Sequence, residues 1–169
     1  GVDSARYFLF RATPFGDDGD FSEKALIERH NNELADKLGN LVSRVSSLIA
    51  LLSVPQNTEL RGKKYGVEKT ENKLLKKLNL KKIEKLFENY KFDKILNEIF
   101  LFIDICNEYV QNKKLWETKN KKQLYELKES ILKIAELLWP FIPETSEKIT
   151  KQFNAKKIKK GEILFKKIK

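Results

Sequence analysis

Two polar side chains suited to recognition stand one helical turn apart in the segment GNLVSR, residues 39–44. The amide of Asn40 offers a donor and an acceptor together, and the guanidinium of Arg44 offers a planar fork of donors. This combination matches the edge of a nucleobase or a phosphate group. On geometry alone, however, an ordinary helix surface with two polar residues explains the pair better.

The surrounding pattern predicts the helix that would carry this pair. Apolar residues recur at steps of three and four, which helices produce and strands do not. At about 100° per residue, this stripe points away from Asn40 and Arg44, so both side chains are predicted to lie outside the core. Gly39, which costs about 1 kcal/mol inside a helix, indicates close packing there. The stripe consists of Leu34, Leu38, Leu41, Val45, Leu48 and Leu52.

A third candidate, Trp116, stands in the polar stretch NKKLWETKN, beyond a helix predicted at about 92–111. An exposed indole can stack on an unpaired base, an interaction worth about 1–3 kcal/mol. The alternative is that the ring folds back onto the bundle as a lid. Trp139, flanked by core residues in LLWPF, is predicted to be structural.

No catalytic or metal-binding set is predicted. Asp17, Asp18 and Asp20 lack the further ligands of a calcium loop, so a turn and a helix cap are expected there. His30 is expected to cap its helix or to face solvent. Cys106, the single cysteine, is assigned to packing at a core-facing position.

Composition indicates a folded helical protein, and its basic excess fits either a polyanionic partner or solvated helix faces. The 169 residues fit one domain, and 41% are apolar and 34% charged, which excludes a disordered chain. The net charge is +10, yet residues 1–50 hold six Lys or Arg against eight Asp or Glu. The excess therefore lies later in the chain, and residues 151–169 alone carry eight lysines and one glutamate. No apolar run approaches the roughly 20 residues of a membrane span, so no membrane partner is expected.

The chain is predicted to be an all-α, antiparallel bundle of about five helices. The first long helix should begin near Asp20 to Ser22, where a side chain can accept free amide protons. Others are expected at about 71–88, 92–111, 120–138 and 144–153, with a loop at 54–70 and a short helix or strand at 4–10. The chain contains no methionine, and we expect a piece of a longer polypeptide.

Several stretches, in this order, resemble the C-terminal part of the methionyl-tRNA synthetase family. They are GVDSARYFLFRATPFGDDGDFS, NNELADKLGNLVSR, ENYKFDKILNEIF, NEYVQNKKLW and LWPFIPETSEKI, followed by LFKKI near the end. The resemblance implies the end of a linker at 1–19, a helical anticodon-binding bundle at 20–153 and a basic tail at 154–169. It also implies the class I synthetase type of bundle.

What the resemblance implies about function is specific. This bundle reads the CAU anticodon of methionine tRNA, and by position Asn40, Arg44 and Trp116 contact the anticodon bases. Its partners would be methionine tRNA and the catalytic domain of the same enzyme, with no DNA partner, in the cytoplasm. No cofactor is expected in this domain, whereas the parent enzyme would use ATP and methionine. The HIGH and KMSKS motifs of the catalytic domain do not occur here, so the chain is expected not to aminoacylate by itself.

Two positions depart from the family pattern. Leu115 stands where the family usually has proline before the tryptophan, and Asp36 stands where it tends to have asparagine. A carboxylate at position 36 is expected to stay away from the RNA backbone. Two alternatives remain open: the equivalent domain of a synthetase for leucine, isoleucine, valine or cysteine, and a helical protein-interaction module whose basic faces are merely solvated.

Overall fold

The described part of the protein is built from helices. The computed structural model describes residues 1–13, 16, 21–52 and 71–169. The loop predicted at 54–70 and the cluster of Asp17, Asp18 and Asp20 lie outside the described residues. The regular elements in the described ranges are all helical, which confirms the predicted all-α class. In chain order they are α1 (Val2–Ala12), α2 (Glu23–Arg29), the π-helical segment η1 (His30–Gly39), α3 (Asn40–Leu51), the 3-10 turn η3 (Leu75–Lys77), α4 (Leu80–Glu88), α5 (Phe92–Asn112), α6 (Leu115–Thr118), α7 (Lys121–Leu138) and α8 (Pro143–Phe153).

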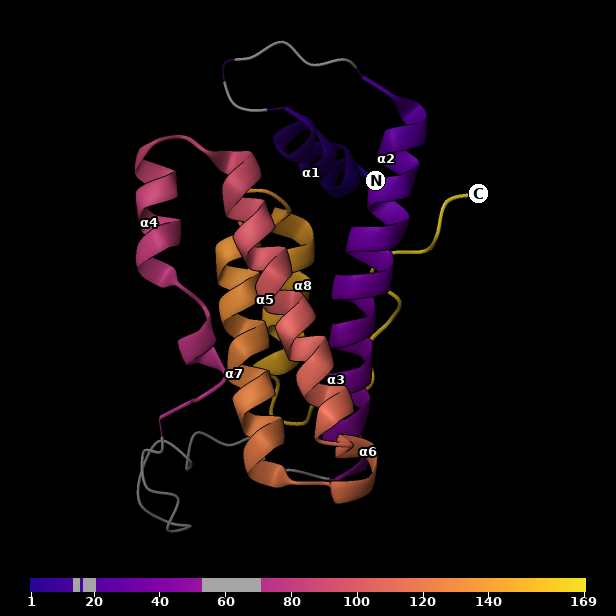
Figure 1. Ribbon diagram of the computed structural model, residues 1–169. Coiled ribbons are helices and arrows are strands. Elements are labelled where there is room, and N and C mark those ends of the chain that lie inside the picture. The colour runs from indigo at the N-terminus through magenta and orange to yellow at the C-terminus, as the bar shows by residue number, and fades with distance from the viewer. Residues whose placement is uncertain (14–15, 17–20, 53–70) are drawn as a thin grey trace.

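Three of these elements, α2, η1 and α3, form one continuous helix that runs along the bundle (Figure 1). It begins as predicted, because the Ser22 hydroxyl accepts a hydrogen bond from the Ala25 amide at 3.3 Å. The π-helical turns of η1 were not predicted. They explain Gly39, since an added Cβ would lie 3.2 Å from the Leu34 carbonyl oxygen of the same helix.

Helices α1, α5 and α7 pack against this long helix, while α4 packs on α5 and α8 packs on α7 (Figure 1). From α5 through α7 to α8 the chain reverses at each connection, and α3 packs on both α5 and α7. Helix α1 crosses one end of the bundle, and the short α6 lies at the other. The core contains Leu34, Leu38, Leu41 and Val45 of the predicted stripe, together with the inner faces of α5, α7 and α8. Leu48 and Leu52, the last two residues of that stripe, are only half-buried at its edge.

The helix predicted at 71–88 is interrupted. The side chain of Asn72 accepts hydrogen bonds from the amides of Leu74 and Leu75, which closes the 3-10 turn η3. Leu78 is extended, and α4 begins afresh where the Asn79 side chain accepts from the Lys82 amide at 3.0 Å. Two asparagines therefore compete with the helix backbone and divide the segment.

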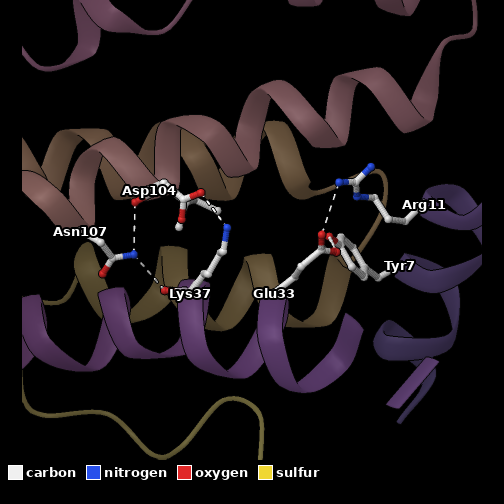
Figure 2. Close-up of polar contacts among 7 residues, drawn as sticks. Tyr7, Arg11, Glu33, Lys37, Asp104 and Asn107 are labelled. Atoms are coloured by element: carbon white, nitrogen blue, oxygen red, sulfur yellow. Dashed lines mark hydrogen bonds and ion pairs between the residues drawn. The ribbon is translucent and has the colours of Figure 1, made fainter. Parts of the chain in front are cut away.

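Helix α1 is fixed to the bundle by polar contacts that span the sequence. The Asp3 carboxylate accepts from the Thr145 amide in the first turn of α8 at 2.7 Å, and Arg6 donates to the carbonyl oxygens of Pro140 and Phe141. Helix α1 also contacts η1, because the Tyr7 hydroxyl donates a hydrogen bond to the Glu33 carboxylate (Figure 2). Residues 1–12 are thus packed as part of the folded unit.

Residues 154–169, which we call the C-terminal strap, follow the surface of the bundle without helix or strand structure. Ile158 and Phe165 are buried in the core, and the ring of Phe165 stands edge-on to His30. Asn31 holds the end of the strap by two hydrogen bonds, one to the carbonyl and one from the amide of Ile168. The basic tail is therefore anchored along the long helix, and its seven lysines are all exposed.

Two residue-level predictions were wrong and one was confirmed. His30 is buried, because its ring bridges the Ser4 hydroxyl of α1 and the Lys166 carbonyl of the strap. Trp139 is 55% exposed, since the chain turns at the end of α7 and its neighbours fill the core instead. Cys106 is buried as predicted, and burial raises the pKa of its thiol to about 12. No helix in the described ranges is long and apolar enough to cross a membrane.

Candidate nucleic-acid interface

Asn40 and Arg44 lie in the first two turns of α3, as their spacing predicted. The intervening and following apolar residues, Leu41 and Val45, are fully buried against the bundle. This packing leaves Asn40 exposed and Arg44 half-buried, so both side chains lie outside the apolar core. The helix therefore presents an amide and a guanidinium one turn apart.

The guanidinium of Arg44 is oriented by the end of α5. Gln111, with its amide oxygen turned toward Arg44, accepts hydrogen bonds from Nη2 and Nη1 at 2.5 and 3.1 Å. A guanidinium has five N–H donors, so this contact leaves donors for a further acceptor. Because one end of the fork is held, the direction of the remaining donors is restricted.

The exposure of Trp116 follows from the turn between α5 and α6. Lys114 adopts a left-handed conformation, with φ of 44°, which reverses the chain after α5. Leu115 then fills a fully buried position in the core, and the next residue, Trp116, is left 43% exposed. Its indole N–H donates to the Glu117 carboxylate at 3.2 Å. The buried Leu115 side chain thus anchors the turn before Trp116, at the position where the family usually has a rigid proline.

The three candidates come from two places in the sequence, α3 and the turn that follows α5. Gln111, which contacts Arg44, belongs to the last turn of α5, and α6 follows it after a short turn. Figure 1 shows α6 at the end of the bundle where α3 also ends. The indole is not deep inside the molecule, and the amide and guanidinium lie on the helix that reaches the same end.

Asp36 has a partner that sequence reasoning missed. Its carboxylate pairs with Lys167 of the strap, Nζ to Oδ2, at 2.7 Å. The lysine side chain is the more exposed of the two, at 61% against 42%. The site therefore carries no isolated negative charge one turn before Asn40. Asp36 and Lys167 lie 131 residues apart in the sequence, which is why no local pattern pairs them.

A polar stripe on α5 faces the helix that carries the site. Asp104 pairs with the Lys37 ammonium at 2.7 Å, and Asn107 donates to the Lys37 carbonyl at 3.3 Å (Figure 2). Gln111 continues the stripe to Arg44. Spacings of three and four place these residues on one helix face, which is the one signal that the sequence offers for them.

No group in the described ranges gathers three or more His, Cys, Asp or Glu side chains in a metal-binding arrangement. The surface offers hydrogen-bond donors, an aromatic face and lysine charges. Such a set can bind unpaired bases and phosphates.

Comparison with known proteins identifies the class. The family model described as the anticodon-binding domain of tRNA ligase matches residues 71–168, more than half of the chain. A second model, tRNA synthetases class I (M), matches residues 1–46, which include Asn40 and Arg44. The chain belongs to the anticodon-binding domain family of tRNA ligases.

The individual relatives to which the chain is similar are methionine enzymes. The chain is 34% identical to the methionine-tRNA ligase of Caldanaerobacter subterraneus subsp. tengcongensis over 99% of its own length, and 32% identical to that of Bacillus subtilis over 90%. Among solved structures, it is similar to the apo form of Mycobacterium tuberculosis methionyl-tRNA synthetase, with a TM-score of 0.77 and 25% identity over 100% of the chain and 39% of that structure. The predicted resemblance is confirmed. The chain spans 30% and 24% of the lengths of the two curated relatives.

Proposed function

We propose that this chain reads the CAU anticodon loop of methionine tRNA. In this proposal, the Trp116 indole stacks on an anticodon base, while Asn40 and Arg44 hydrogen-bond to base edges. Single-stranded loops suit such a surface, because their splayed bases expose both faces and pairing edges. The observation that carries the proposal is the exposed indole at the end of the bundle where α5 holds the Arg44 guanidinium.

The C-terminal strap supplies contacts of a second kind. Its seven lysines are exposed along a segment whose backbone is anchored to the bundle by Ile158 and Phe165. We assign these lysines to phosphate groups of the RNA backbone. Such contacts strengthen binding without regard to sequence and weaken with added salt.

The larger protein would be an ATP-dependent methionine-tRNA ligase in the cytoplasm. This part of the proposal rests on the relatives, of which the chain covers less than a third. ATP and methionine would bind to the catalytic domain, which is the second proposed partner of this chain. The role left to the chain itself is selection of the tRNA.

Two tryptophans of similar exposure allow a matched test. Trp116→Ala should lower affinity for a CAU stem-loop by about 5- to 150-fold, the equivalent of about 1–3 kcal/mol of stacking. Trp139→Ala removes the same ring from a 55% exposed position at the α7–α8 turn and should leave affinity unchanged. Fluorescence anisotropy of a labelled stem-loop, with CAU and with substituted anticodons, measures both.

The outcome for substituted loops decides the role of the indole. If Trp116 reads a base, its removal erases the preference for CAU and leaves weak, salt-sensitive binding to every loop. Equal loss of all stem-loops, or a parallel loss in Trp139→Ala, would contradict base reading at this position. Absence of any salt-sensitive binding of the unaltered chain would favour a protein-interaction module instead.

A further inference from the structure

The π-helical segment η1 ends at Gly39, and α3 begins at the next residue, Asn40. The Asn40 amide donates to the Ala35 carbonyl, five residues back, and also to the Lys37 carbonyl. Asn40 thus sits where the hydrogen-bond pattern of the long helix changes from the wider π form to the α form. The rotation of Asn40 about the helix axis depends on where that change occurs.

One side chain from outside the helix contacts this junction. Asn107 on α5 donates from Nδ2 to the Lys37 carbonyl at 3.3 Å and to the Ile103 carbonyl of its own helix at 3.2 Å (Figure 2). The Lys37 carbonyl therefore receives the Asn40 amide and the Asn107 amide together. Asn107 is therefore a second donor at a carbonyl that lies where the helix changes form.

The hydrogen bond from Asn107 restrains the helix in a way that apolar packing does not. Leu38 and Leu41 on either side of the junction are fully buried, so packing alone resists large movement of the helix. Apolar packing is non-directional, so it does not set the local hydrogen-bond register of the helix. An amide donor aimed at one carbonyl is directional. Asn107 is thus placed to fix the register at Lys37, about two turns before Arg44.

We propose that Asn107 is a positioning residue for base recognition: by donating to the Lys37 carbonyl, it sets the register of the helix and so the direction in which Asn40 points. The proposal rests on the anticodon-reading function of this surface. Asn107 itself contacts no RNA in this scheme. Its effect is transmitted through the backbone of η1.

The test compares two asparagines of α5 under the same chemical change. Asn107→Asp removes the donor and brings a carboxylate against the Lys37 carbonyl. Asn97→Asp makes the same change at an exposed position of the same helix and serves as the charge control. Asn107→Gln keeps an amide donor. The 169-residue chain and each variant are titrated with a CAU stem-loop and with a single-base variant of its anticodon, and their melting temperatures are recorded.

We expect Asn107→Asp to reduce the ratio of the affinity for the CAU stem-loop to the affinity for the single-base variant by about tenfold. The affinity of Asn107→Asp for the variant stem-loop should stay within twofold of the affinity that Asn97→Asp has for it. Asn107→Gln should restore most of the ratio. An unchanged ratio in Asn107→Asp would overturn the proposal. An equal loss for both loops that parallels a lowered melting temperature would also overturn it, since a merely structural role predicts that result.

Failure of the underlying function is recognised separately. If the unaltered chain binds both loops equally, anticodon reading itself is wrong, and the role assigned to Asn107 is wrong with it. If the unaltered chain prefers CAU and Asn107→Asp keeps that preference, only the positioning role is wrong.

Discussion

The last few residues of the C-terminal strap should detach from the bundle when Phe165 is replaced by alanine. Phe165 is 8% exposed, and burial of such a side chain contributes about 1.5–3 kcal/mol. Three hydrogen bonds, from His30 to Lys166 and between Asn31 and Ile168, contribute about 1 kcal/mol each. Ordering the backbone opposes them by about 1–2 kcal/mol per residue. The attachment of the last few residues is therefore close to balanced, and loss of the ring shifts it toward release.

Amide hydrogen exchange measures this release directly. The Ile168 amide donates to the Asn31 side chain, so it should be protected in the unaltered chain and exchange freely in Phe165→Ala. Ile163→Ala is the control, because it truncates an aliphatic side chain of the same strap that is 72% exposed. An Ile168 amide that stays equally protected in Phe165→Ala would refute the reasoning about the anchor.

The same variant tests the lysines, because it changes no charge. If Lys166, Lys167 and Lys169 bind phosphates, release should weaken all stem-loops alike and leave the preference for CAU intact. The slope of log affinity against log salt should fall by up to about 2, at about 0.7 for each lost contact to single-stranded RNA. A released strap with unchanged affinity and slope would show that these lysines do not contact the RNA.

Two further predictions concern stability. Asp3→Ala removes the acceptor of the Thr145 amide in the first turn of α8 and should lower the free energy of unfolding by about 1.5–3 kcal/mol in urea titrations; no change would mean that solvent replaces this contact. Burial raises the pKa of the Cys106 thiol from 9.0 to about 12. The contribution of this thiol to the free energy of unfolding is therefore fully present below pH 9 and is lost as the pH rises toward 12, by up to about 1.4 kcal/mol per pH unit. Cys106→Val should reduce the loss of stability across that window, and rapid reaction of native Cys106 with a thiol reagent at pH 8 would contradict its burial.

The sequence by itself determined the features that depend on neighbours along the chain. Helical periodicity predicted the stripe through Leu34 and Leu41 and left Arg44 outside it. The Ser22 cap was readable because its partner lies three residues away. The exposure of Trp116 agreed with its polar surroundings. In each case the information lies within one or two helical turns, which is the range over which a sequence pattern reports geometry.

Tertiary structure decided the contacts between elements. His30 resembles a surface residue in sequence, yet it is buried because α1 and the strap supply partners for both ring nitrogens. Trp139 resembles a core residue, yet the turn after α7 directs it outward. The pairing of Asp36 with Lys167 and the bond from Asn107 to the Lys37 carbonyl join distant segments. Such partners have no signature in local composition, because a polar side chain is satisfied equally well by water until folding brings a specific acceptor or donor to it.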